Sequence, residues 1–174
     1  MKPLILCDKN GESVGAATWK EAHEPPGKLH KAFSIYAFRN FGKELLIQKR
    51  STKKPLWAGV WANSCCSHPH KDEKIEDAAR RRLQEECGFS CDIKPACTFV
   101  YRAEDSSGKG VEHEHVTVFL GLIDEQITVK PNPDEVEDAK WIGVEELRAD
   151  MKENPKKYAP WFHLGMNAIR ESIS

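Results

Sequence analysis

The sequence predicts an α/β protein in which helices pack on both faces of a mixed β-sheet. Apolar segments of strand length alternate along the chain with segments whose apolar residues recur at helical spacing. One segment, residues 115–123, is apolar at nearly every position, as in strands that are covered on both faces. The chain has 174 residues and no repeat, low-complexity tract or Ser/Gly linker, so we expect a single domain over residues 1–174.

The strands are predicted from short apolar runs bounded by turn residues. Residues 23–30 contain a Pro-Pro-Gly turn between two histidines, and the aromatic-rich strand 32–38 follows it. A turn around Gly42 then leads into a short buried strand at 45–47. Residues 99–103 and 115–123 are expected to form further strands.

Three helices are expected between and after these strands. The first covers about residues 74–87 and ends at Gly88, because glycine readily adopts the left-handed conformation that closes many helices. A shorter helix is predicted in "VEELRADM". A longer one is predicted in "PWFHLGMNAIRESI", where Pro160 stands near the start.

Charge and hydropathy argue against two classes of partner. Lys plus Arg number 26 and Asp plus Glu number 27, so the net charge of −1 does not favour a nucleic-acid binder. No apolar run reaches the roughly 18 residues of a membrane span, and the N-terminal run is too short for a secretory signal. We therefore expect a cytoplasmic protein, monomeric by default. Its six cysteines should be free, metal-bound or catalytic.

One carboxylate falls on the apolar face of the first predicted helix. At 100° per residue, Glu86 lies near the centre of a face formed by apolar residues, with Arg82 beside it. A carboxylate in such a position is costly unless it is paired or binds a metal. Two interpretations remain open: a buried ion pair between Glu86 and Arg82, or an acidic ligand for a hard cation.

Two more carboxylates share one face of a predicted strand. Glu112 and Glu114 are two residues apart, so they point to the same side and repel each other unless a cation or a shared proton intervenes. A solvated strand start is the alternative. Together with His23, His30 and His68, these carboxylates form a donor set that suits Mn²⁺, Zn²⁺ or Fe²⁺.

Five motifs occur in a fixed order: "GKLHKAFS", "WAGVWANSCCSHP", "YRA", "VEHEH" and "APWF". In order and spacing they resemble the type 1 isopentenyl diphosphate isomerases of the Nudix superfamily, over about residues 3–170. The resemblance implies a Nudix-like α/β/α sandwich around a mixed β-sheet. It also implies conversion of isopentenyl diphosphate to dimethylallyl diphosphate, a step of isoprenoid biosynthesis that acts on a small-molecule prenyl diphosphate.

The broader Nudix signature, GX5EX7REUXEEXGU with U a bulky apolar residue, is matched only in part. Residues 67–89 read "SHPHKDEKIEDAARRRLQEECGF", in which Ser67 replaces the signature glycine. Arg82 replaces a glutamate that normally helps to hold the metal of the hydrolases. The loss argues against diphosphate hydrolysis and agrees with the isomerases, which also depart from the signature here.

The resemblance implies individual roles. Cys66 and Glu114 correspond to the catalytic cysteine and glutamate, one adding and the other removing a proton, with Tyr101 able to relay it. Cys65 should point elsewhere. Substrate-binding positions are Arg50 and Lys54 at the diphosphate and Trp161 at the cationic intermediate.

The resemblance also implies two metals. A second divalent ion, Mn²⁺ or Zn²⁺, would be held by five residues: His23, His30, His68, Glu112 and Glu114. Glu86 would bind the Mg²⁺ that arrives with the diphosphate.

Two rival functions explain only part of this pattern. A Nudix diphosphohydrolase would leave Cys66 and Glu114 idle. A zinc-binding module built on Cys65, Cys66, His68 and His70 would leave the carboxylates unexplained.

Overall fold

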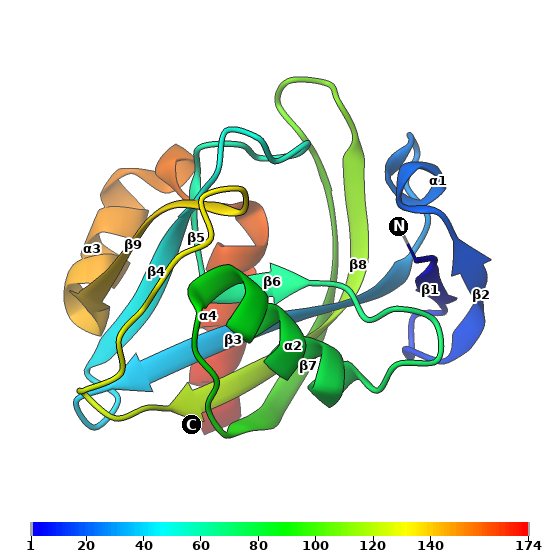
Figure 1. The fold of residues 1–174 in the computed structure, drawn as a ribbon. Helices are drawn as coiled ribbons and strands as arrows, with labels where there is room; N and C mark the ends of the chain where they lie inside the picture. Colours follow the sequence, from blue (N-terminus) through cyan, green and yellow to red (C-terminus); the bar gives the residue numbers. More distant parts are fainter. Residues whose placement is uncertain (1, 174) are drawn as a thin grey trace.

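The computed structural model describes residues 2–173, without the side chain of Ile173, and contains one mixed sheet with helices on both sides (Figure 1). The strands are β1 (Leu4–Cys7), β2 (Ser13–Ala17), β3 (His30–Arg39), β4 (Glu44–Arg50), β5 (Trp61–Ala62), β6 (Cys65–Ser67), β7 (Ile93–Glu104), β8 (Val111–Leu122) and β9 (Val136–Gly143). The helices are α1 (Trp19–His23), α2 (Ile75–Cys87), α3 (Val144–Glu153) and α4 (Pro160–Ile173), with a 3-10 turn, η1 (Pro155–Lys157), before α4.

Strand β3 organises the sheet. It pairs in parallel with β8 and antiparallel with β1, β4 and β6, while β7 pairs antiparallel with β8 and β9 with β4. The mixture of parallel and antiparallel pairs confirms the predicted mixed sheet. Because β8 lies between β3 and β7, it is covered at both edges as well as on both faces, which fits its apolar sequence.

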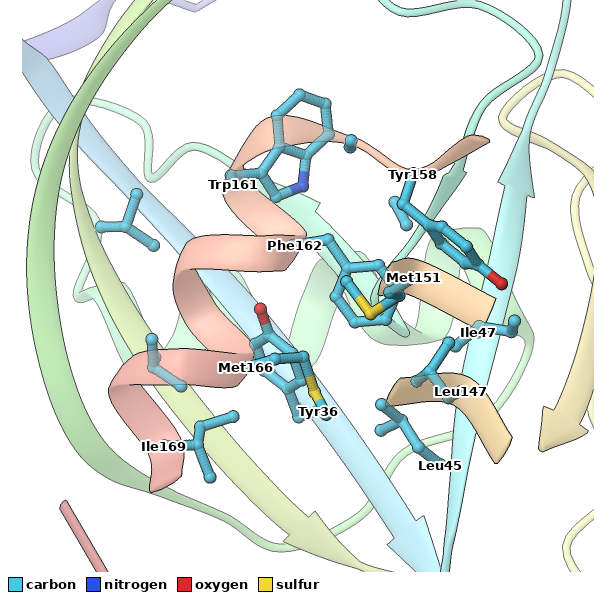
Figure 2. Packing of buried hydrophobic residues seen from close by; sticks show 14 of the residues in the cluster. Tyr36, Leu45, Ile47, Leu147, Met151, Tyr158, Trp161, Phe162, Met166 and Ile169 are labelled. Atoms are coloured by element: carbon cyan, nitrogen blue, oxygen red, sulfur yellow. The ribbon is translucent and has the colours of Figure 1, made fainter. Parts of the chain in front are cut away.

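Alternating side chains divide the core into two layers. Phe33 and Ile35 of β3 point toward α2 and pack with its Leu83, whereas Ala32 and Tyr36 point to the opposite face. On that second face α3 and α4 cover the sheet, and Figure 2 shows how their side chains interdigitate with those of β3 and β4. The labelled residues there are Tyr36, Leu45, Ile47, Leu147, Met151, Tyr158, Trp161, Phe162, Met166 and Ile169.

The three predicted helices are confirmed. Helix α2 ends as expected, since Gly88 follows it with φ 75° and donates its N–H to the Gln84 carbonyl. Strand β4 extends beyond the predicted 45–47 because Gln48 and Arg50, although polar, are buried and remain in the ladder. The short elements β1, β2, α1, β5 and β6 and the edge strand β9 were not predicted, because they are brief or polar and depend on pairing with distant segments.

No helix among residues 2–173 is long and apolar enough to cross a membrane.

Candidate active site

Strand register brings three of the predicted site residues into one row. His30 of β3 stands opposite Glu114 of β8, and Glu114 stands opposite Tyr101 of β7. Directly paired side chains on one face of a sheet lie about 5 Å apart. The pairing of three strands, rather than any local motif, therefore places an imidazole, a carboxylate and a phenol side by side.

Two histidines present unpaired ring nitrogens to this row. His23 at the end of α1 and His30 at the start of β3 each hold their Nδ1 2.7 Å from a backbone carbonyl, that of Trp19 and of Lys28 respectively. A carbonyl can only accept, so Nδ1 carries the hydrogen and Nε2 of the neutral ring is a free acceptor. Both Nε2 atoms are buried without a hydrogen-bond partner.

These nitrogens belong to a compact set that we call the histidine end of the site: His23, His30, His68 and Glu114. Their candidate ligand atoms all lie within 4.8 Å of one another. Burial and the neighbouring imidazoles lower the pKa of His23 to about 3, so its ring is neutral at pH 7, the form that binds metals. Buried nitrogen atoms without partners beside a carboxylate fit a divalent ion.

Glu112 and Glu114 are both buried, at 8% and 7% exposure, so the alternative of a solvated strand start is wrong. Glu112 is not among the four converging groups, and Tyr101 lies between it and Glu114. Its Oη is 2.5 Å from a Glu112 oxygen and 2.9 Å from a Glu114 oxygen. A phenol has a single hydrogen to donate, so one of these contacts needs a protonated carboxyl.

The surroundings of the two carboxyls shift their pKa values in opposite directions. Burial and the adjacent Glu114 raise the pKa of Glu112, whereas the imidazoles of His30 and His68 overcome burial and hold the pKa of Glu114 below its usual value. Without a bound metal, these directions favour a proton shared between Glu112 and Tyr101, next to a carboxylate at Glu114.

The two adjacent cysteines of β6 face opposite layers. Cys65 is fully buried in the layer under α2, while Cys66 packs with the other layer and lines the cavity. Burial raises the pKa of the Cys66 thiol to about 12, an effect opposed by Arg50, whose Nη1 lies 3.7 Å from Sγ. Arg50 itself is fixed by hydrogen bonds from Nε and Nη2 to the carbonyls of Trp57 and Leu56.

Cys66, His68, Glu112 and Glu114 open into a cavity of about 730 Å³. Part of its wall is apolar, formed by Leu4, Trp19, Phe33, Leu56 and Trp161. The indole of Trp161 is held by a hydrogen bond from Nε1 to Asn63 and packs edge-on against Trp57. Trp57 and Trp61 are not among the lining residues.

A further part of the cavity lining is what we call the charged rim: Lys53, Lys54, Arg82, Glu85, Asp134 and Glu135. Lys54 and Arg82 both pair with Glu135, and Arg82 also pairs with Glu86 at 2.6 Å. The ion pair that the helix pattern allowed therefore exists. Glu86 is 3% exposed and also accepts a hydrogen bond from Gln48, so its buried charge is fully paired.

Cys65, Cys66 and His70 stand outside the converging set. His70 is half-buried and lies near Arg81 and Glu73 instead. Within residues 2–173 the four-residue zinc module is therefore not assembled.

Known proteins resemble this chain in sequence and in fold. The chain matches the NUDIX domain family over residues 28–162. An Aromatoleum aromaticum protein named isopentenyl-diphosphate Delta-isomerase 2 is 42% identical over 91% of this chain and 81% of its own length. A Photorhabdus laumondii protein of the same name is also 42% identical, over 95% of this chain and 91% of its own length. The chain belongs to the isopentenyl-diphosphate Delta-isomerases of the Nudix family.

Solved structures agree on the fold. A Deinococcus radiodurans protein superposes with a TM-score of 0.70 at 20% identity, covering 88% of this chain and 90% of that one. A Methanosarcina mazei MutT protein superposes with a TM-score of 0.65 at 17% identity, covering 84% and 96%. The predicted Nudix-like α/β/α sandwich is thus confirmed for this isopentenyl-diphosphate Delta-isomerase family member.

Several residues of the site in this isomerase family member were not predicted from the sequence. Glu135 and Trp19 line the cavity, and Asn63 anchors Trp161 while also donating to the carbonyls of Ile35 and Cys65. Asn63 stands directly before the "SCC" run, but its amide gives no periodic signal. Glu135 sits in a polar loop and depends on a contact across 53 residues.

Proposed function

We propose that this protein isomerises isopentenyl diphosphate to dimethylallyl diphosphate. The observation that carries the proposal is that Cys66 and Glu114 both line one partly apolar cavity, with Tyr101 hydrogen-bonded to Glu114. A nucleotide diphosphohydrolase would leave this thiol and carboxylate without a role. The curated relatives that are named isopentenyl-diphosphate Delta-isomerase match this chain over most of their length, and they support the same reaction.

The reaction needs one proton to be added and another removed. The alkene π pair forms a new C–H bond at the terminal carbon, which leaves a tertiary carbocation. A proton then departs from the carbon two positions away, and its C–H pair becomes the new double bond. Glu114, acting through Tyr101, and Cys66 supply the acid and the base, and they exchange these roles in the reverse direction.

The surroundings suit a cationic intermediate. Trp161 presents its indole to the cavity, and a cation over an aromatic face is stabilised by roughly 0.5–2 kcal/mol. Ionised Glu114 adds an electrostatic contribution. The apolar wall limits the access of water, which would otherwise trap the carbocation. Arg50 stabilises the thiolate form of Cys66 from 3.7 Å.

The four converging groups of the histidine end fit one divalent ion. We propose that the histidine end, together with Glu112, holds Mn²⁺ or Zn²⁺, and that Glu86, which is paired with Arg82, binds the Mg²⁺ that accompanies the diphosphate. When bound, these ions supply positive charge that increases the acidity of the neighbouring carboxyl and neutralises the substrate head group. Arg50 and Lys54 contribute the protein's own positive charge toward that head group.

We further propose that the chain works as a single-domain monomer in the cytoplasm. All six cysteines are free, although Cys65 and Cys66 are adjacent, which is consistent with a reducing compartment.

The reaction is tested by incubating the protein with isopentenyl diphosphate and Mg²⁺ in D₂O and following the products by proton NMR. Isomerisation gives dimethylallyl diphosphate that carries deuterium. Release of phosphate or pyrophosphate without isomerisation would favour the Nudix diphosphohydrolase instead. Absence of turnover with Mg²⁺, Mn²⁺ and Zn²⁺ would contradict both enzymatic functions.

A further inference from the structure

Glu135 holds two of the cations that face the cavity. Its Oε2 lies 2.6 Å from Lys54 Nζ, and its Oε1 lies 3.0 Å from Arg82 Nη2. The carboxylate is 24% exposed and lines the cavity. An anion that enters the cavity must therefore compete with Glu135 for these cations.

Backbone hydrogen bonds fix the position of the loop that carries this carboxylate. The N–H of Glu135 donates to the carbonyl of Asn132, and its own carbonyl accepts from Ser51 N–H, each at 3.0 Å. Asn132 in turn donates its N–H to the carbonyl of Glu86 near the end of α2. These hydrogen bonds attach the loop both to α2 and to the segment after β4. Glu135 is therefore held in place by its backbone as well as by the ion pairs of its side chain.

The cations of the charged rim are paired with neighbouring carboxylates of the protein. Arg82 also pairs with Glu85 and Glu86, and Lys53 pairs with Asp134. Three cations, Lys53, Lys54 and Arg82, are therefore paired with the four carboxylates Glu85, Glu86, Asp134 and Glu135, and Glu85 is also paired with Arg81. A metal-free diphosphate that reaches Lys54 lies beside the negative carboxylate of Glu135. The repulsion between these two negative groups lowers the affinity for the diphosphate many-fold.

We propose that Glu135 makes binding of a diphosphate head group conditional on a divalent cation. By pairing with Lys54 and Arg82, it rejects the metal-free diphosphate and admits the form whose charge a divalent ion has reduced. The ligand class rests on the proposed function, but the effect concerns binding and needs no turnover. Glu135 is a selectivity residue in this account and takes no part in proton transfer.

The test measures calorimetrically how inorganic pyrophosphate binds to the metal-loaded protein with and without added Mg²⁺. For Glu135→Gln we expect the affinity without Mg²⁺ to rise about tenfold, since a fixed like charge is removed, and the enhancement by Mg²⁺ to shrink by a similar factor. The matched control is Glu137→Gln. Glu137 pairs with Lys49 at 2.8 Å, does not line the cavity and loses the same charge. Its binding should match that of the wild type.

The direction of the change separates this role from a structural one. Weaker pyrophosphate binding both with and without Mg²⁺ would mean that Glu135 merely organises the loop, and would overturn the proposal. So would unchanged affinities, or a wild-type protein that fails to bind pyrophosphate even with Mg²⁺. If Glu135→Gln behaves as expected while isopentenyl diphosphate is not turned over, the proposed function fails and the selectivity of Glu135 stands.

Discussion

The histidine end and the charged rim satisfy their polar groups in different ways. At the histidine end, His23 and His30 bury ring nitrogens that have no hydrogen-bond partner. At the charged rim, Lys54 and Arg82 are paired with carboxylates, and only Nε of Arg82 is buried without a hydrogen-bond partner. Burying the ring nitrogens is costly unless a ligand pairs with them, whereas an anion that binds at the rim competes with ion pairs that already exist.

The difference indicates how each side meets its ligand. The histidine end is preorganised, because Nδ1 hydrogen bonds to carbonyls fix both the tautomer and the ring direction. The charged rim must exchange internal ion pairs for ligand contacts, so its affinity is a difference between two sets of interactions. Substitutions near the histidine end should therefore affect the chemical step, and those at the charged rim should affect binding.

The largest effect is expected at Cys66 and Glu114, the two groups proposed to transfer protons. Cys66→Ala and Glu114→Gln should each reduce kcat by at least about a thousandfold, since each removes an acid–base group. Circular dichroism should show that both variants stay folded.

Cys65→Ala is the matched control for Cys66→Ala, because Cys65 is adjacent but faces the layer under α2. It should remain active. An inactive Cys65→Ala with an active Cys66→Ala would show that the two side chains have been assigned to the wrong faces.

A smaller effect is expected at the charged rim. Lys54→Ala should raise KM for isopentenyl diphosphate about tenfold with a lesser change in kcat, because it removes one charge-assisted contact to the head group. Lys53→Ala is the comparison, since its side chain is 67% exposed and pairs with the equally exposed Asp134. Steady-state kinetics in which kcat falls and KM stays constant for Lys54→Ala would contradict the division between chemistry and binding.

The smallest effect is expected at the ion pair between Arg81 of α2 and Glu73, which does not line the cavity. Two hydrogen bonds from Arg81, at 2.8 and 2.9 Å, and one from the His70 N–H lower the pKa of Glu73 to about 2. A carboxyl with a lowered pKa stabilises the fold above its unfolded pKa of about 4.5 and loses that contribution as the pH falls toward 2.

Glu73→Gln should therefore lower the free energy of unfolding at pH 7 by about 1 kcal/mol. The difference from wild type should shrink steadily below pH 4.5. Urea unfolding at several pH values measures it, and a difference that grows on acidification would contradict the assignment. Activity should change little, because the pair serves the loop before α2.

The sequence revealed the site where a residue broke a local pattern. Glu86 stood out on an apolar helix face, and Glu112 and Glu114 stood out as paired carboxylates on a strand, because helical and strand periodicities can be read along a single segment. Arg82 was recognised as the partner of Glu86 for the same reason, since four residues separate neighbours on a helix.

The rest depended on strand pairing and loops. His30 meets Glu114 only through the parallel register of β3 with β8, which the sequence does not specify. Tyr101 reaches both carboxylates through the neighbouring register of β7. Glu135 contacts Arg82 because a loop returns to α2, and irregular loops leave no periodic signal.

The most direct test of the account is metal binding at the histidine end. After chelation and removal of metal, the wild-type protein should bind Mn²⁺ tightly in a calorimetric titration, and His23→Ala, His30→Ala and His68→Ala should each weaken that binding strongly. His70→Ala is the control, since His70 lies two residues from His68 but outside the converging set, and it should bind as the wild type does. Unchanged Mn²⁺ affinity and stoichiometry in the His23, His30 and His68 variants would contradict a metal site there.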